Sequence, residues 1–287
     1  MAVAERTVLD VVRLSTDYLA QHGSRSPRLD AELLCAHAWG LRRLDLYLQH
    51  DRPLPEAELA AARALVRRRA EGEPVAYITG SREFFNRTFA VDRSVLIPRP
   101  ETETLVELAV QRIRSRGDEC VAADLGTGSG CIAVTLAAEL SALRVVATDV
   151  SDAALDIARD NATRHGVADR VTFLSGDWGD ALPDAVDVVV SNPPYVTKAE
   201  LAQVDRDVRD FEPRGALDGG DDGFAAYRSL VPSLRDRVNP GAILLLEVDP
   251  RRAAGVASLA GGAFDGARTS LHRDLAGNDR VVEAQLA

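Results

Sequence analysis

The chain has 287 residues, of which 46% are hydrophobic and 27% charged, and these values are typical of a folded globular protein. Its formal net charge of −10 argues against a general binder of phosphate backbones, so we expect no stable nucleic-acid partner. The three cysteines are odd in number and widely spaced, a pattern that indicates neither a disulfide framework nor a metal site.

The N-terminal residues, Met1 to Asp10, contain acids and no long apolar core, so no signal peptide is expected. No uncharged run approaches the ~20 residues that a membrane-spanning helix needs. The sequence therefore predicts a cytoplasmic protein without a membrane partner.

Residues 1–75 are predicted to form a small helical domain. Apolar residues recur at helical spacing from Val8 to Leu19, and a second helix is expected from Leu29 to Gly40. A third should run from Pro55 to Arg69, where arginines suit a helix C-terminus.

Residues 76–97 are predicted to form a β-hairpin linker. Two short strands are expected at Tyr77–Gly80 and Arg87–Val91, with a glycine and an asparagine as turn residues. The following run, Ile97–Glu103, should open a helix in which Thr102 or an acid serves as the N-terminal cap.

From about residue 120, strands and helices alternate. Strands are expected at 121–125, 145–149, 171–174, 186–191 and 242–248, and helices at 131–140, 153–165 and 230–238. This alternation predicts an α/β domain over residues 98–287, with a doubly wound, Rossmann-like parallel sheet.

A glycine-rich turn, Asp124–Gly130, closes the first of these strands and opens a helix. Its spacing is Gly-x-Gly-x-Gly, whereas a dinucleotide site would have Gly-x-Gly-x-x-Gly. This difference favours S-adenosylmethionine, which has no pyrophosphate. Gly126, Thr127 and Gly128 would bring backbone against its methionine moiety.

The next two strands end in residues that suit the rest of this cofactor. Asp149 could accept hydrogen bonds from ribose hydroxyls. Asp177 could bind the adenine amino group, and Trp178 could pack on the purine face. Two alternatives stay open: Asp149 could cap the helix near Ala153, and Trp178 could be a core aromatic residue.

The stretch Asn192-Pro193-Pro194-Tyr195 follows the apolar strand at 186–191. Consecutive prolines supply no backbone N–H and hold the chain extended, which leaves the carbonyls of Asn192 and Pro193 without internal partners. Together with the Asn192 side chain, these acceptors can bind a planar –NH2 group. The stretch therefore indicates chemistry on an amide or amino nitrogen.

With these residues in place, the chain resembles the HemK/PrmC family of protein-(glutamine N5) methyltransferases. The matching segments are 73–80, 96–103, 124–130, 191–196, 211–213 with 216–217 and 219–220, and 274–281. Asn-Pro-Pro-Tyr alone also occurs in adenine-specific DNA methyltransferases. The run Ile97–Glu103 points to the protein-glutamine branch.

The resemblance implies that the protein methylates the glutamine of the Gly-Gly-Gln motif in class-1 peptide chain release factors, with the helical domain helping to hold this partner. It implies cofactor contacts from Gly126, Thr127, Gly128, Ser129, Gly130, Asp149, Trp178 and Asn192. The residues implied for the target glutamine are Asn192, Pro193, Pro194 and Tyr195.

Two other functions are considered: an N-methyltransferase for adenine or for another protein or small-molecule amide, and a non-catalytic module that binds the cofactor and a protein. One segment departs from the family pattern, because Glu247-Val248-Asp249-Pro250 stands where the family usually has Glu-Ile-Gly. This departure indicates either local drift or a paralogue with another substrate.

The expected mechanism assigns catalytic roles to three residues. The Asn192 side-chain oxygen and the Pro193 carbonyl would accept the two N–H bonds of the target amide, and Tyr195 would pack against the substrate side chain. Positioning and fixed acceptors, rather than a strong base, would supply most of the acceleration.

Overall fold

The computed structural model describes residues 6–117 and 120–287. The chain forms two compact units, one comprising Met1–Gly80 and Asp205–Phe211 and the other Ser81–Val204 and Glu212–Ala287. The predicted linker at residues 76–97 is divided between them, because its residues from Ser81 onward belong to the second unit. Within the described residues, no helix combines the length and apolar character needed to cross a membrane.

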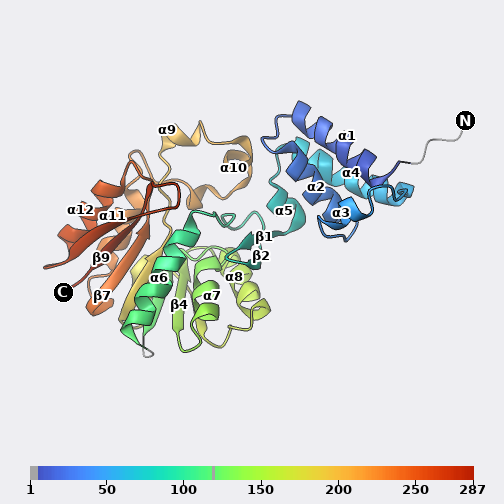
Figure 1. Ribbon diagram of the computed structural model, residues 1–287. Helices are drawn as coiled ribbons and strands as arrows, with labels where there is room; N and C mark the ends of the chain where they lie inside the picture. The colour runs from blue at the N-terminus through green and yellow to red at the C-terminus, as the bar shows by residue number, and fades with distance from the viewer. Residues whose placement is uncertain (1–5, 118–119) are drawn as a thin grey trace, which may run out of the picture. The chain divides into compact units, whose positions relative to one another are not determined.

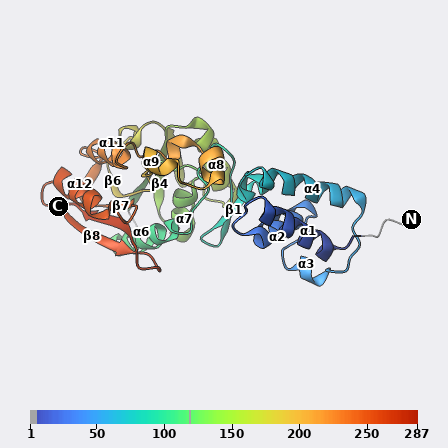
Figure 2. The ribbon, with the colours of Figure 1, turned by 90° about the horizontal axis from the view of Figure 1, so that it is seen from above.

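The first unit is helical, and its three predicted helices are confirmed. They are α1 (Val8–Gln21), α2 (Pro27–Ala38) and α4 (Glu56–Ala70), which pack against one another (Figures 1 and 2). Leu19, Leu34 and Val66 are buried where they meet. The unit also contains the short helices α3 (Asp45–Leu48), α5 (Val75–Thr79) and α10 (Arg206–Phe211).

The predicted strand at Tyr77–Gly80 is wrong, because these residues form helix α5 and its C-cap. Pro74 precedes the helix, and Gly80 ends it in the left-handed region with φ +69°. Tyr77 and Ile78 are both buried, so packing outweighs the strand preference of these residue types.

The hairpin consists of β1 (Ser81–Phe84) and β2 (Arg87–Ala90), paired antiparallel from Ser81↔Ala90 to Phe84↔Arg87. Phe85 and Asn86 form the two-residue turn, and both have positive φ, as a type I′ turn requires. The predicted strand beginning at Arg87 is therefore confirmed.

A seven-stranded sheet dominates the second unit, in the order β5-β4-β3-β6-β7-β9-β8 (Figure 1). Its strands are β3 (Val121–Leu125), β4 (Arg144–Asp149), β5 (Val171–Ser175), β6 (Val186–Ser191), β7 (Val238–Glu247), β8 (Arg268–Arg273) and β9 (Asp279–Gln285). The strands β3 to β7 pair parallel, as predicted, whereas β9 pairs antiparallel with both β7 and β8.

Helices cover both faces of this sheet. Alternate strand residues such as Ala122 and Val190 join the core beneath α6 (Thr102–Arg116), α7 (Cys131–Glu139) and α8 (Asp152–Arg164). Residues that point to the other face of the sheet, such as Leu125 and Val189, pack on α11 (Ala225–Ser233) and α12 (Ala253–Ala263). The central strands are thus apolar on both faces, as expected for buried parallel strands.

Of the two residue types expected to cap α6, the acid holds the position: Glu101 is the N-cap, without a side-chain capping bond, and Thr102 is the first residue of the helix. One expected helix position needs correction. The helix expected at 230–238 lies at 225–233, because the chain from Val238 onward pairs with β6 as part of β7. The remaining short elements are α9 (Lys198–Leu201) and the 3₁₀ turns η1 (Trp178–Ala181) and η2 (Arg214–Ala216).

Candidate active site

A cavity of about 240 Å³ opens at the carboxyl ends of β3, β4, β5 and β6. The strand order changes direction between β3 and β6, and ligands of doubly wound sheets bind at such a switch point. The cavity is lined by Ser94, Val95, Leu96, Gly126, Gly128, Asp149, Val150, Ser151, Ala154, Gly176, Asp177, Trp178, Asn192, Pro194, Pro213, Gly215 and Ala216.

The glycine-rich turn contributes backbone to this cavity. Gly126, Gly128 and Gly130 all have positive φ, which glycine adopts without steric cost. A Cβ on Gly130 would lie 3.1 Å from the backbone Cα of Ala158, so this glycine also permits close packing of α8. Of the five predicted turn residues, Gly126 and Gly128 line the cavity. Thr127, Ser129 and Gly130 are not among its lining residues.

Asp124 stabilises the glycine-rich turn through hydrogen bonds to its side-chain carboxyl group. Its Oδ2 atom accepts hydrogen bonds from the Thr127 hydroxyl at 2.6 Å and from the Ala133 backbone N–H at 3.0 Å. Burial of this fully enclosed carboxyl raises its pKa to about 7. Its Oδ1 atom has no hydrogen-bond partner among the described residues. Asp124 therefore ties the turn to the first turn of α7.

Asp149 connects the ends of two neighbouring strands. Its Oδ2 accepts from the Gly128 N–H and its Oδ1 from the Ser151 N–H, both at 2.9 Å. The cap of α8 is Ser151, whose side chain accepts from the Ala154 N–H, so the alternative that Asp149 caps this helix is wrong. The Asp149 carboxylate instead faces the cavity beside the glycine turn.

Asp177 and Trp178 line the same cavity after β5. Trp178 has φ +42°, an uncommon conformation for a bulky residue and one that the surrounding structure must enforce. A Cβ on Gly126 would lie 3.3 Å from the Trp178 ring. The ring also packs on the core beneath α11 and α12. The two interpretations of Trp178 therefore do not exclude each other, since it contacts both core and cavity.

The Asn192–Tyr195 stretch reaches the cavity with two of its members. Asn192 and Pro194 line it, whereas Pro193 is buried and Tyr195 packs on the core beneath α11. The Asn192 side-chain nitrogen donates to the Thr102 hydroxyl at 3.2 Å. Its side-chain oxygen is therefore the atom that stays available to a ligand.

Sequence reasoning missed one wall of the cavity, which is formed by residues 94–96 and 213–216. Glu212 joins these two segments, because its carboxylate accepts from the Ile97 N–H at 3.1 Å and from Arg99 at 2.5 Å. Leu96, Pro213 and Ala216 belong to segments that carry the family resemblance, but neither stretch contains a chemical motif that would have indicated a site.

The strand order, the antiparallel β9 and the glycine turn at the switch point define a class I methyltransferase. A solved methyltransferase from Pyrococcus furiosus has the same fold, with a TM-score of 0.52 at 18% identity over 79% of this chain and 97% of that one. Family models match as well: the PrmC N-terminal domain at residues 10–80 and the methyltransferase small domain at residues 102–208.

Curated relatives identify the family. A release factor glutamine methyltransferase from Rhodopirellula baltica is 43% identical over 98% of this chain and 97% of its own length. Another, from Nitratidesulfovibrio vulgaris, is 46% identical over 91% of this chain and 88% of its own length. The chain belongs to the release factor glutamine methyltransferase family.

Proposed function

We propose that the protein transfers a methyl group from S-adenosylmethionine to the N5 amide nitrogen of the glutamine in the Gly-Gly-Gln motif of a class-1 peptide chain release factor. The observation that carries this proposal is the orientation of Asn192. With its nitrogen bound to Thr102, its oxygen can accept an N–H from a planar amide in the cavity.

The chemistry of the cavity suits the methyl donor. It combines glycine backbone at Gly126 and Gly128, the carboxylates of Asp149 and Asp177, and the Trp178 ring. These groups match a nucleoside with hydroxyls, an amino group and a flat base, and the bound donor would supply an electrophilic methyl group. Asn192 lines the same cavity. We assign Thr127, Ser129 and Gly130 to shaping the turn.

The protein's own task is to position a weak nucleophile. An amide nitrogen attacks poorly because its lone pair is delocalised. The Asn192 side-chain oxygen and the Pro193 carbonyl would accept its two N–H bonds and direct the nitrogen at the methyl group. Pro194 would confine the substrate side chain, and Tyr195, which packs on the core, would anchor the stretch. Fixed acceptors also favour the positive charge that develops on nitrogen as the bond to the methyl carbon forms and the bond from that carbon to the donor's sulfur breaks, before one N–H proton passes to solvent water.

We propose that the first unit contributes to binding the release factor. Large apolar side chains are exposed there, among them Leu44 at 61% and Leu48 at 69%. Leu44 and Leu48 lie one helical turn apart, and neighbouring exposed apolar side chains of this kind mark protein interaction sites. The formal charge of −10 supports a protein partner and no stable nucleic-acid partner.

One experiment tests the activity against its alternatives. Methyl-labelled S-adenosylmethionine is offered with a release factor, with the release factor's Gln→Ala variant at the Gly-Gly-Gln motif, and with adenine-containing DNA. Label that enters the release factor and is lost with the Gln→Ala change supports the proposal. Label in DNA, or in none of the three, contradicts it.

A further inference from the structure

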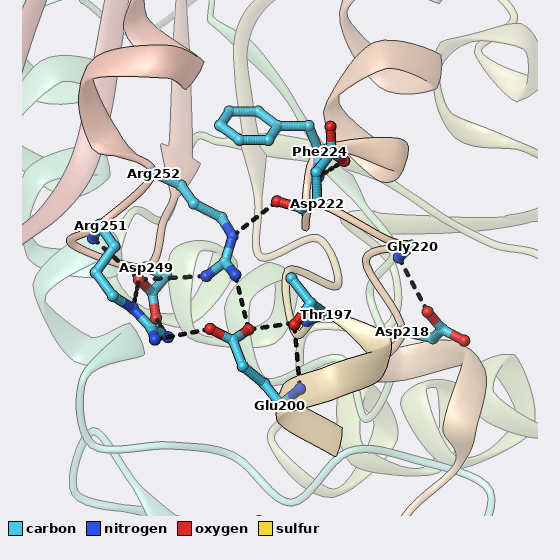
Figure 3. Close-up of polar contacts among 9 residues, drawn as sticks. All are labelled: Thr197, Glu200, Asp218, Gly220, Asp222, Phe224, Asp249, Arg251 and Arg252. Carbon is cyan, nitrogen blue, oxygen red and sulfur yellow. Dashed lines mark hydrogen bonds and ion pairs between the residues drawn. The ribbon is translucent and has the colours of Figure 1, made fainter. Parts of the chain in front are cut away.

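Arg252, in the loop after β7, binds three separate segments at once (Figure 3). Its guanidinium pairs with Glu200 at 2.7 Å and with Asp249 at 3.3 Å, and its Nε donates to the Asp222 carbonyl at 3.1 Å. The side chain is 8% exposed. A guanidinium is suited to this task because it presents several donors in a rigid fork.

The carboxylates of this cluster are themselves held in place. Glu200 accepts from the Thr197 N–H at 2.9 Å in a capping box at the start of α9, and it also pairs with Arg251 at 2.7 Å. Asp249 accepts from the backbone N–H and the guanidinium of Arg251. Two arginines thus face two carboxylates, so the charges balance.

One of the segments that Arg252 joins, residues 218–223, packs against the backbone of Tyr195. A Cβ on Gly219 would lie 2.7 Å from the Tyr195 Cα, and one on Gly223 would lie 2.6 Å from the Tyr195 carbonyl oxygen and 2.1 Å from the Arg252 Nε. The next residue is bound as well: Val196 donates to the Leu217 carbonyl at 3.0 Å and accepts from the Gly219 N–H at 2.8 Å.

We propose that Arg252 is a positioning residue that fixes the path of the Asn192–Tyr195 stretch, by holding residues 197–200, which follow this stretch in the chain, to residues 218–223, which pack on Tyr195. The proposal rests on the proposed function, which assigns the substrate's amide to this stretch. The proposal also gives a role to Asp249, which stands where the family pattern Glu-Ile-Gly has glycine. Its carboxylate binds both Arg251 and Arg252.

Arg251 offers a matched control. It contacts the same two carboxylates as Arg252, but it is 66% exposed and has no bond to the Asp222 carbonyl. Arg252→Met and Arg251→Met remove the same charge from neighbouring positions. Only the first should release the loop that packs on Tyr195.

The test compares kcat for release-factor methylation, the Kd of S-adenosylmethionine and the hydrogen exchange of the Val196 and Gly219 amides. Arg252→Met should lower kcat about 10- to 100-fold and speed exchange at both amides at least about 10-fold, with the cofactor Kd within about twofold. Arg251→Met should change each quantity less than about threefold.

Hydrogen exchange needs no substrate, so it separates this proposal from the proposed function. If the wild type methylates no release factor, the function fails while the exchange comparison still stands. Unchanged exchange in Arg252→Met, or an equal effect of Arg251→Met, overturns the positioning role. If Arg252→Met does not fold, Arg252→Lys serves instead. The single ammonium group of lysine cannot bind Glu200, Asp249 and the Asp222 carbonyl at the same time. A kcat and an exchange rate at the wild-type level in Arg252→Lys would therefore also overturn the proposal.

Discussion

The side-chain nitrogen of Asn192 lies 3.2 Å from the hydroxyl oxygen of Thr102, although 90 positions separate the two residues. An asparagine amide has a donor end and an acceptor end, and a hydrogen bond to one end decides where the other points. The first residue of α6 thereby sets which atom of Asn192 faces the cavity.

Thr102→Val removes this hydroxyl with little change of shape. The Asn192 amide should then rotate, and we expect kcat for glutamine methylation to fall about 10-fold, the equivalent of one lost hydrogen bond of ~1.4 kcal/mol. The cofactor Kd should hardly change. Thr104→Val, on the same helix, is the control, and an equal loss in both variants would contradict the role of Thr102.

Asn192→Ala removes the acceptor itself. We expect kcat to fall about 10²–10³-fold, as when one preorganised polar contact to the reacting group is lost. Steady-state kinetics with saturating cofactor and release factor measure this effect. Near-normal turnover of the variant would exclude the proposed mechanism.

Asp149→Ala should weaken cofactor binding. It removes an acceptor for the ribose and also frees the N–H groups of Gly128 and Ser151. Bonds to a charged acceptor contribute about 1.5–3 kcal/mol, so the Kd measured by calorimetry should rise about 10- to 100-fold. Asp152→Ala, which removes an exposed carboxylate on α8, should leave the Kd near the wild-type value.

Glu247, at the end of β7, should make stability depend on pH. It is fully buried, and burial raises its pKa from 4.5 to about 7. Between pH 4.5 and about pH 7, Glu247 is ionised in the unfolded chain but still protonated in the folded one. The contribution of Glu247 to the free energy of unfolding therefore falls as the pH rises through this range.

Glu247→Gln should therefore be more stable than the wild type at pH 8, by up to about 2–3 kcal/mol, with a smaller difference at pH 5 in urea unfolding. Glu283→Gln is the opposite control. The Arg112 guanidinium holds the pKa of Glu283 below its ordinary value, so this variant should lose stability at pH 8 and lose less as the solution is acidified. A gain for Glu247→Gln that does not grow with pH would contradict the assignment.

Leu44→Ser and Leu48→Ser test the role of the first unit. Both side chains are exposed, so stability should change by no more than about 0.5 kcal/mol. The KM for release factor should rise several-fold, whereas kcat at saturation and the cofactor Kd should not change. Leu275→Ser, at an exposed position in the second unit, is the control.

Local patterns were sufficient to predict the parts of the site that lie next to one another in sequence. The glycine turn and Asn192 follow apolar strands and Asp149 ends one, and parallel strands bring their carboxyl ends to one edge of the sheet. Thr102 and Glu212 could not be found in this way, because their partners are about a hundred residues distant and only tertiary packing brings them together.

The dependence on tertiary packing also explains where the fold differs from the sequence-based prediction. Tyr77 and Ile78 favour a strand by type, but burial within the first unit selects a helix. The position of β9 between β7 and β8 depends on pairings such as Glu247↔Val281, which no local pattern encodes.

That antiparallel strand has a consequence for the order of folding. β7 and β8 do not pair with each other, so β8 can join the sheet only through β9. Each β7–β9 pair closes a loop of more than thirty residues that includes α12, and the entropy of such closure slows assembly. The pairs between β3 and β4, such as Val121↔Arg144, close shorter loops, so β9 and β8 should join the sheet after β3 and β4 have paired. Folding-kinetic φ-values, which compare the transition state with the native state, should therefore be lower for Val281 and Val282 than for residues of β3 and β4.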